Sequence, residues 1–297
     1  MKADLLDGKS IAKQVRREVE KEVSNLRNEH GIKPCLAVVL VGNDPASQVY
    51  VHNKQKAAIE VGMMAKDIKI PASITQNELE NIVTDLGNDQ NIHGLLIQLP
   101  LPSHLNSDPL IEKINPNKDV DGLHPLNLGM LVKGSGGFIP ATPAGIQQIL
   151  IRSGLEISGK HIVICGRSQI VGKPLSILLS QRDTNSNATV TLCHTKTTNL
   201  AEITQQADIL IAAMGQPKVI SSEMIKPKAV IIDVGTNRVK DPTKKQGFKL
   251  IGDVDFDEVC NKASAITPVP GGVGPMTIAM LLSNTLKAAK STLIPNQ

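Results

Sequence analysis

The sequence is poor in aromatic side chains, with one tyrosine, three phenylalanines and no tryptophan among 297 residues. Proteins that bind single-stranded nucleic acid stack its bases on aromatic rings, which this chain lacks. The net charge of +4 is modest, and its Lys and Arg residues form no block that could serve as an electrostatic platform. We therefore expect no nucleic-acid partner.

Long apolar runs are also missing. A membrane-spanning helix needs about 20 consecutive apolar residues, and no such run occurs, nor is there an apolar signal-peptide segment near Met1. The four cysteines are far apart, without Cys-x-x-Cys spacing, and most lie in or beside apolar runs; they are Cys35, Cys165, Cys193 and Cys260. We expect reduced core cysteines in a cytoplasmic protein without a membrane partner.

Several catalytic signatures are absent. There is no His-Glu-x-x-His or Cys/His spacing for a metal, and no Gly-x-Ser-x-Gly elbow of a serine hydrolase. Five residues, not four, separate Gly166 from Gly172, and Pro174 stands where a P-loop has its magnesium-binding Ser or Thr. Asp119 and Asp121 resemble the start of a calcium loop, but the later ligands are missing. We expect no metal site.

The sequence does contain a regular alternation of strand-like and helix-like segments. The expected strands are continuous apolar runs, which are typical of parallel strands covered on both faces. They lie at 35–42, near 64–70, and at 93–99, 160–166, 188–194, 207–215, 229–235 and 264–269. Expected helices include 8–29, 45–62, 75–87 and 276–290. The sequence thus predicts an α/β fold.

The alternation falls into two sets, separated by a Pro-, Asn- and Gly-rich stretch at 99–145. We predict two domains with a cleft between them: a catalytic αβα domain at 1–145 and a Rossmann-like domain at 146–275. The last helix, 276–297, has a strong apolar stripe that must be buried, and we expect it to return to the first domain.

The helix expected at 45–62 carries a lysine within an apolar stripe. Asp44 can cap its start, and Gly62 suits its end. Helical spacing places on one face Tyr50, Lys54, Ala57 and Val61. Lys56 falls on the opposite, solvated side. Lys54 is either a functional amine or a lysine whose stem lies along the core and whose ammonium reaches water.

Two further polar groups follow strands of the first set. Gln98 ends the apolar run at 93–99, and Asp119 and Asp121 lie on a turn beyond it. Taken alone, Gln98 could form hydrogen bonds with backbone groups of a loop, and either aspartate could cap the next helix. Because ligands bind at the carboxyl ends of parallel strands, the joint occurrence of Lys54, Gln98 and Asp121 favours a site.

In the second set, a strand, a glycine turn and a helix follow one another. The turn is not a regular Gly-x-Gly-x-x-Gly, because Ser168 replaces the second glycine and Val171 the third. The small side chain at 168 still allows a phosphate to approach the helix N-terminus, and Arg167 adds positive charge. The alternative is an α/β domain that binds no dinucleotide.

The end of the next strand, "TLCHTKTT", distinguishes between dinucleotides. An NAD site has an acid there to bind the ribose 2′-hydroxyl, but this segment has none. Thr195 and Lys196, together with Arg167, suit a 2′-phosphate instead. The sequence thus predicts NADP as cofactor.

The segment "TPVPGGVGPMT", 267–277, combines three prolines and three glycines before the last helix. A plain connection rarely needs such control of backbone angles. We interpret it as a loop that grips a flat ligand through its backbone.

Seven segments occur in order over nearly the whole chain: "SQVYVHNKQKAA", "GLLIQLPLP", "KDVDGLHPLN", "GRSQIVGKP", "TVTLCHTKT", "GDVDF" and "PVPGGVGPMT". Together they resemble the bifunctional methylenetetrahydrofolate dehydrogenase/methenyltetrahydrofolate cyclohydrolase (FolD) family. The chain departs from the family pattern at Ala141, where a cysteine is frequent, and at 182–187, which lengthen a loop.

The resemblance implies the roles of individual residues. It places Tyr50 and Lys54 in the folate cleft, makes Gln98 the partner that tunes this lysine, and makes Asp121 the acid that holds the pterin; these four form the implied catalytic set. Further implied substrate contacts are Ile97, Leu99, Pro270, Gly271, Gly272, Val273 and Gly274. The implied NADP contacts are Gly166, Arg167, Ser168, Thr195 and Ile232.

The resemblance also implies the reactions: NADP-dependent oxidation of 5,10-methylenetetrahydrofolate, then hydrolysis of the methenyl product to 10-formyltetrahydrofolate. It implies a homodimer in the one-carbon metabolism that serves purine, methionine and histidine biosynthesis. Two alternatives remain open from the residues alone: another two-domain NADP-dependent dehydrogenase, or a non-catalytic NADP-sensing module.

Overall fold

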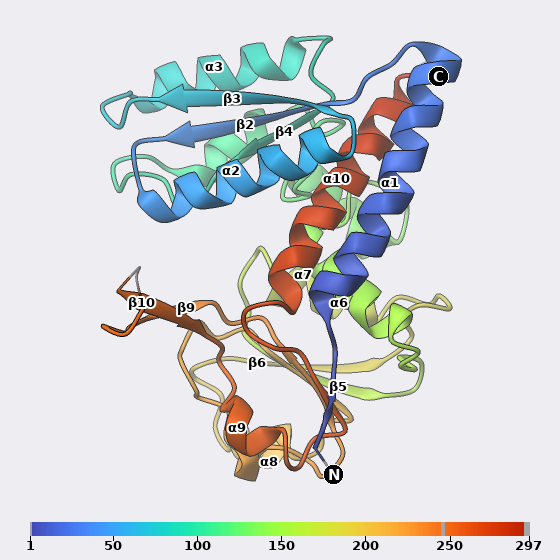
Figure 1. Cartoon of the computed structure of the whole chain (residues 1–297), viewed down its shortest axis with the longest axis vertical. Coiled ribbons are helices and arrows are strands. Elements are labelled where there is room, and N and C mark those ends of the chain that lie inside the picture. Colours follow the sequence, from blue (N-terminus) through green and yellow to red (C-terminus); the bar gives the residue numbers. More distant parts are fainter. Residues whose placement is uncertain (1, 245–246, 294–297) are drawn as a thin grey trace. The chain divides into compact units, whose positions relative to one another are not determined.

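The computed structural model of the chain describes residues 2–244 and 247–293, which form two compact units (Figure 1). One unit consists of residues 13–141 and 278–293, and the other of residues 2–12 and 142–277. The chain passes between the units within three helices, α1 (Gly8–His30), α6 (Ala141–Arg152) and α10 (Val273–Ser291).

The unit of residues 13–141 and 278–293 is built on a three-stranded parallel sheet of order β3-β2-β4. The strands are β2 (Cys35–Val41), β3 (Met64–Ile70) and β4 (Gly94–Ile97). The central strand β2 is buried at every position, as expected for a strand covered on both faces. Figure 1 shows α2 (Pro45–Glu60) and α3 (Gln76–Asn88) on opposite faces of this sheet. Two short helices follow, α4 (Ser107–Lys113) and α5 (Pro125–Lys133).

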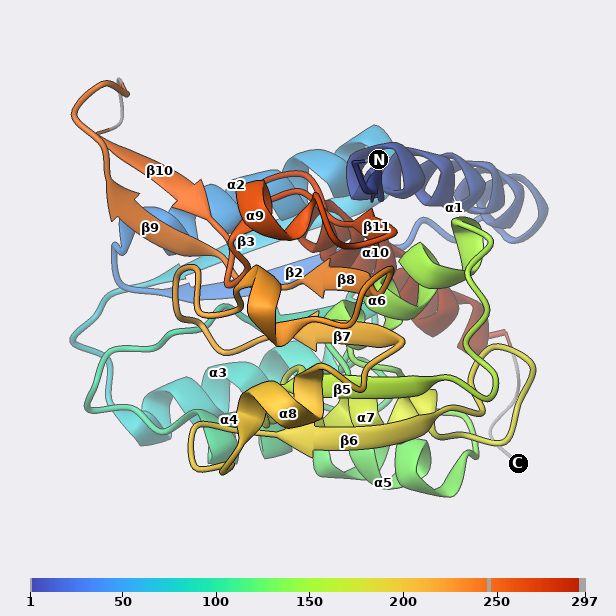
Figure 2. The ribbon, with the colours of Figure 1, turned by 90° about the horizontal axis from the view of Figure 1, so that it is seen from below.

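The other unit is built on a six-stranded sheet of order β1-β11-β8-β7-β5-β6, in which every neighbouring pair is parallel. Figure 2 shows β6, β5, β7 and β8 side by side. The strands are β1 (Asp4–Leu5), β5 (His161–Cys165), β6 (Thr189–Cys193), β7 (Ile209–Ala212), β8 (Val230–Asp233) and β11 (Ala265–Ile266). After β5 the chain adds β6 on one side and then β7 on the other, so the topological switch point lies between β5 and β7.

The remaining elements of this unit are short. They are α7 (Gly172–Leu179), α8 (Leu200–Thr204), the 3₁₀ helix η1 (Ser222–Met224) and α9 (Phe256–Val259). The sequence did not predict the antiparallel hairpin of β9 (Asn237–Lys240) and β10 (Phe248–Ile251). The strand β9 is mostly polar, and both strands are partly exposed. The guanidinium carbon of Arg238 lies 4.7 Å from the centre of the Phe248 ring.

The structure differs from the sequence prediction at the N-terminus. The sequence assigned residues 1–145 to one domain, but Asp4 pairs with Ala265, so β1 belongs to the six-stranded sheet. A strand of two residues has no periodicity that could reveal it. From Ile278 onward, α10 groups with residues 13–141.

Three features bear on expectations from the sequence: the cysteines, the apolar character of the helices and the grouping of side chains that can bind a metal. All four cysteines are buried and form no disulfide, which confirms that they are core residues. Within residues 2–244 and 247–293, none of the helices is both long enough and apolar enough to cross a membrane. The same ranges contain no group of three His, Cys, Asp or Glu side chains arranged to hold a metal ion.

Candidate active site

The helix α2 presents Lys54 to the protein interior. Its start is capped as predicted, because the Ser47 backbone N–H donates to the Asp44 carboxylate at 2.7 Å. Gly62, just beyond its end, has a φ of +83°, which a glycine adopts without strain. Lys54 is 9% exposed, and its buried neighbours on the helix are Val51, Ala57 and Ala58. Lys56 is exposed, as the helical spacing predicts.

The ammonium of Lys54 contacts the side chain of Gln98. Lys54 Nζ donates to Gln98 Oε1 at 3.1 Å, and Gln98 Nε2 donates to the Leu99 carbonyl at 2.7 Å. The second bond fixes which end of the amide faces the lysine. The Gln98 backbone N–H donates to the Val39 carbonyl at 2.8 Å, so its position is set by the pairing of neighbouring strands. The structure therefore brings together two residues that lie far apart in the sequence.

Burial lowers the pKa of Lys54 from the ordinary value of a lysine, and the charge of Asp121 acts in the opposite direction. Desolvation disfavours the charged amine, and Gln98 offers only a neutral acceptor, so the loss of hydration is the larger effect. The amine consequently releases its proton at a lower pH than a solvated lysine does. Such a group gives up a proton more readily than a solvated lysine does, which suits it to proton transfer.

The two aspartates of the KDVDG turn have separate surroundings. Asp119 is 1% exposed, and its carboxylate accepts from the His124 backbone N–H and from Asn127 Nδ2, both at 2.8 Å. It also accepts from the Gly122 N–H at 3.2 Å, and burial raises its pKa. Asp119 thus organises the turn, whereas Asp121 is half-buried and its charge acts on Lys54. The sequence allowed such a turn or cap role for either aspartate and could not separate the two.

Tyr50, Ile97 and Leu99 are the other predicted residues of this unit. Tyr50 lies one turn before Lys54 and is 43% exposed, so its ring has a free face. Leu99 is half-buried, and Ile97 is buried at the end of β4. Of these three, Tyr50 offers the most accessible surface to a ligand.

The glycine turn after β5 is shaped by close backbone packing. Gly166 has a φ of +135°, and a Cβ on it would lie 2.1 Å from the Ala213 carbonyl oxygen. A Cβ on Gly172 would lie 1.8 Å from the Gly166 carbonyl oxygen. Ser168 Oγ accepts from the Val171 N–H at 3.1 Å, which closes the turn. Gly172, one residue after the position of the third glycine in a regular Gly-x-Gly-x-x-Gly, is the residue that permits the close approach of α7 to the turn.

The neighbouring turn after β6 is polar and has no acid. The His194 N–H donates to Thr197 Oγ1 at 2.9 Å, and the Lys196 N–H donates to His194 Nδ1 at 3.1 Å. Thr195 and Lys196 are exposed, as is Arg167 on the first turn. These side chains and the glycine turn after β5 fit a dinucleotide with a 2′-phosphate. A carboxylate at this strand end would repel the phosphate, and this turn has none. Ile232, by contrast, is fully buried in β8, so its side chain has no exposed surface for the predicted cofactor contact.

The proline- and glycine-rich loop packs against the start of α1. The Lys9 N–H donates to the Gly271 carbonyl at 2.9 Å, and a Cβ on Gly8 would lie 1.9 Å from the Gly272 carbonyl oxygen. Pro270 and Gly274 are exposed, whereas Gly272 and Val273 are buried. Only some of the loop residues predicted to contact the substrate are therefore accessible to a ligand.

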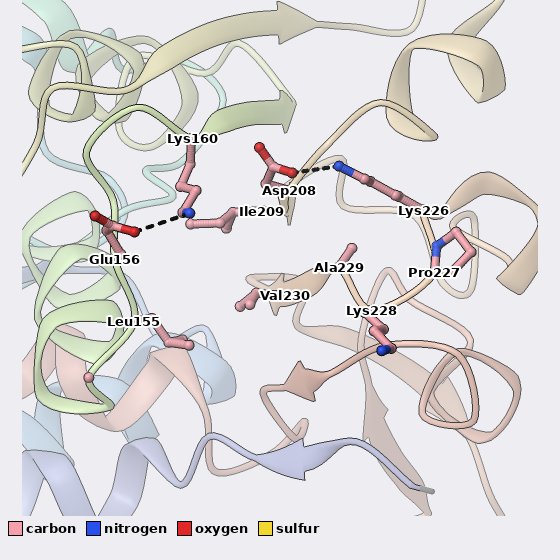
Figure 3. Close-up of a pocket in the computed structure, with 11 residues that line it drawn as sticks. Leu155, Glu156, Lys160, Asp208, Ile209, Lys226, Pro227, Lys228, Ala229 and Val230 are labelled. Atoms are coloured by element: carbon pink, nitrogen blue, oxygen red, sulfur yellow. Dashed lines mark hydrogen bonds and ion pairs between the residues drawn. The ribbon is translucent and has the colours of Figure 1, made fainter.

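A cavity of about 420 Å³ lies at the amino ends of β5, β7 and β8 (Figure 3). Two ion pairs line it, Lys160 with Glu156 at 3.1 Å and Lys226 with Asp208 at 2.6 Å. None of the predicted site residues lines this cavity. The residues predicted to bind the dinucleotide follow the carboxyl ends of the strands, so this cavity is not the candidate active site.

The fold and these residues define a class: an α/β protein with a Rossmann-like unit suited to a dinucleotide and a second unit that carries a buried lysine. Two family profiles identify it further. The tetrahydrofolate dehydrogenase/cyclohydrolase catalytic domain matches residues 6–121, and the NAD(P)-binding domain of the same name matches residues 140–293. The chain belongs to the tetrahydrofolate dehydrogenase/cyclohydrolase family, as its motifs predicted.

Individual relatives match over almost the full length. The chain is 52% identical to the bifunctional protein FolD of Prosthecochloris aestuarii over 96% of this chain and 97% of that protein. Among solved structures, FolD of Campylobacter jejuni is 46% identical, with a TM-score of 0.92 over 98% of this chain and 99% of that one. The Trypanosoma brucei enzyme, solved with NADP and an inhibitor, is 39% identical, with a TM-score of 0.94 over 99% of both chains.

Proposed function

We propose that the chain oxidises 5,10-methylenetetrahydrofolate to the 5,10-methenyl form with NADP, and then hydrolyses that product to 10-formyltetrahydrofolate. The observation that carries the proposal is the buried Lys54, hydrogen-bonded to Gln98 at 3.1 Å and within the field of Asp121. This is a desolvated amine of the kind that proton transfer requires, in a chain that belongs to the family over nearly its whole length.

Binding of the folate is assigned to Tyr50 and Asp121. The exposed face of Tyr50 suits a flat ring, and stacking of this kind contributes about 1 kcal/mol. Asp121 offers hydrogen-bond acceptors to the amino and N–H groups of the pterin. The exposed backbone around Pro270 and Gly274 supplies further contacts to the substrate.

In the hydrolytic step, water adds to the methenyl carbon and loses a proton. A carbon–nitrogen bond of the ring then breaks as the new hydroxyl loses its proton to become the formyl oxygen and the ring nitrogen gains a proton, so that one proton is released overall. Lys54 carries these protons: its amine accepts one as water attacks and returns it as the ring opens. A neutral amine is required, because a fixed positive charge would repel the methenyl cation. Gln98 keeps the amine in place, and its amide adds no charge that would raise the lysine pKa.

In the oxidative step, the protein mainly positions the reactants. NADP, when bound, supplies the hydride acceptor. Gly166 and Gly172 allow the turn to pack closely before α7. Ser168 is small enough for a phosphate to approach the N-terminus of this helix. Arg167 and Thr195 are the groups that would contact the 2′-phosphate.

One assay tests both activities. Purified protein is mixed with methylenetetrahydrofolate and NADP, and the absorbances of reduced nicotinamide and of the methenyl intermediate are followed together. We expect reduced nicotinamide to accumulate while the methenyl signal rises briefly and then decays. A different NADP-dependent dehydrogenase would reduce no NADP with this substrate, and a cofactor-sensing module would bind NADP without turnover.

Gln98→Glu should move the pH dependence of hydrolysis. A carboxylate in place of the amide oxygen 3.1 Å from Lys54 Nζ favours the charged amine and raises the lysine pKa. Hydrolysis needs the neutral amine, so its rate rises with pH through this pKa, and the rise should move to higher pH in the variant. The measurement is the pH profile of kcat for methenyltetrahydrofolate, corrected for the uncatalysed reaction. A profile that coincides with that of the unchanged protein would show that Lys54 is not the titrating base.

Arg167→Ala should weaken the preference for NADP. The loss of a charge-assisted contact to the 2′-phosphate should raise the KM for NADP about 10- to 100-fold and leave the KM for NAD nearly unchanged. Arg182→Ala, a change of another exposed arginine, serves as the control and should alter neither value. Equal losses with both cofactors would contradict a role in recognising the phosphate.

The proposal also covers the setting of the enzyme. We place it in the cytoplasm, as a homodimer in the one-carbon metabolism that serves purine, methionine and histidine biosynthesis, without a nucleic-acid or membrane partner. Light scattering on the purified protein should give twice the chain mass of 31.7 kDa.

A further inference from the structure

Two buried carboxylates lie at the carboxyl edge of the six-stranded sheet, and the proposed reactions use neither. Asp233 is the last residue of β8 and is 4% exposed. Asp253, which follows β10 and precedes α9, is completely buried. Burying an ionised carboxylate is costly unless hydrogen bonds compensate it, so each of these groups must have partners that stabilise its charge.

Asp253 holds the loop that directly follows β7. Its Oδ2 accepts from the backbone N–H groups of Met214 at 2.6 Å and Gly215 at 2.9 Å. Its Oδ1 accepts from Asn237 Nδ2 at 2.8 Å, at the start of the β9–β10 hairpin. One side chain thus joins three segments that are separate in the sequence.

Asp233 in turn holds the segment that carries Asp253. Its Oδ1 accepts from the N–H groups of Gly235 and Asp253, both at 2.9 Å, and its Oδ2 accepts from the Val254 N–H at 3.0 Å. Burial raises the pKa of Asp233 to about 6, so near pH 7 the group is largely ionised and serves as an acceptor. Asp233 therefore holds the backbone at Asp253, and the side chain of Asp253 in turn holds the loop at 213–215.

This loop contacts the glycine turn assigned to the dinucleotide. A Cβ on Gly166 would lie 2.1 Å from the Ala213 carbonyl oxygen, so there is no space between the turn and the loop. The loop follows β7 and the turn follows β5, and the topological switch point, where dinucleotides bind in such sheets, lies between these strands. A displacement of residues 213–215 would therefore displace the turn as well.

We infer that Asp253, held by Asp233, is a positioning residue for NADP, which fixes the loop at 213–215 against the Gly166 turn. It acts through backbone groups and needs no contact with the cofactor. The inference rests on the proposed use of NADP. The hydrolytic reaction does not consume NADP, and its assigned residues, Lys54, Gln98 and Asp121, belong to the other unit.

The test is Asp253→Asn in the full-length protein. The amide keeps the size of the side chain but replaces one acceptor by a donor, which cannot bond to the N–H groups of Met214 and Gly215 and to Asn237 at once. We expect the Kd and KM for NADP to rise about 10-fold or more. We expect kcat and KM of hydrolysis, measured without NADP, to stay within about two-fold. Asp257→Asn, the same change at an exposed position of α9, should alter none of these values.

A milder variant keeps the test decisive if Asp253→Asn does not yield folded protein. Asn237→Ala removes one donor to Asp253 from a partly exposed strand, and we expect a two- to five-fold rise in the KM for NADP with unchanged hydrolysis. Unchanged NADP binding in the folded variants, or a parallel loss of both activities, would overturn the inference. Failure of the unchanged protein to reduce NADP would instead overturn the proposed function.

Discussion

Replacement of Lys54 by methionine is expected to abolish the cyclohydrolase reaction, with a fall in kcat of about 10²- to 10⁴-fold, the range typical of a lost general acid or base. Methionine has nearly the same length and suits the apolar surroundings of Val51 and Ala57, so the fold should be retained. The Kd for NADP should be unchanged, because the cofactor residues belong to the other unit. The measurement is the decay of methenyl absorbance in the absence of NADP.

Lys56→Met is the matched control for this change. It makes the same substitution two residues further along α2, at an exposed position, and should leave hydrolysis unaltered. Rapid hydrolysis by the Lys54 variant would remove Lys54 from the mechanism. Equal losses in both variants would indicate that the methionine disturbs the helix rather than the chemistry.

Gly172→Ala is expected to have the largest effect on the Rossmann-like unit. The new Cβ would lie 1.8 Å from the Gly166 carbonyl oxygen, so the turn or the helix α7 must move. We expect a loss of stability of roughly 1–3 kcal/mol, the usual cost of overpacking, and at least a 10-fold loss in NADP affinity. Thermal unfolding and an NADP titration measure the two effects.

Gly129→Ala distinguishes this clash from the general effect of adding a methyl group to a helix. Gly129 lies in α5, and a Cβ there meets no atom within 4 Å. Alanine is a better helix former than glycine by about 1 kcal/mol, so this variant should be slightly more stable than the unchanged protein. The explanation by close packing fails if Gly172→Ala is as stable as Gly129→Ala.

The elements with strong periodicity were predictable from the sequence. The seven-residue apolar run of β2 and the capped helix α2 lie close to their expected ranges, because local pattern determines both. The helical spacing also placed Lys54 in the buried stripe and Lys56 in solvent. The contact between Lys54 and Gln98 could not be read from local pattern. It was anticipated from the general rule that functional groups gather at the carboxyl ends of parallel strands, and from the family resemblance.

Other features depend on contacts that the local sequence does not record. The two-residue strand β1 exists because it pairs with β11, and the hairpin β9–β10 has little apolar alternation. The sequence could not separate Asp119 from Asp121, because their roles depend on which carboxylate receives the N–H groups of Gly122 and His124. Likewise, Gly172 was assigned no role because the closeness of α7 to the Gly166 turn is a tertiary feature.

The carboxylates of Asp233 and Asp253 fill the space that side chains at Gly252 and Gly235 would need. A Cβ on Gly252 would lie 1.7 Å from Asp233 Oδ2, and a Cβ on Gly235 would lie 2.2 Å from Asp253 Oδ1. A lineage could hardly acquire a side chain at either glycine while its acidic neighbour remained. These four positions should therefore vary together or not at all during evolution, so that one replacement becomes tolerable only after another has made room for it.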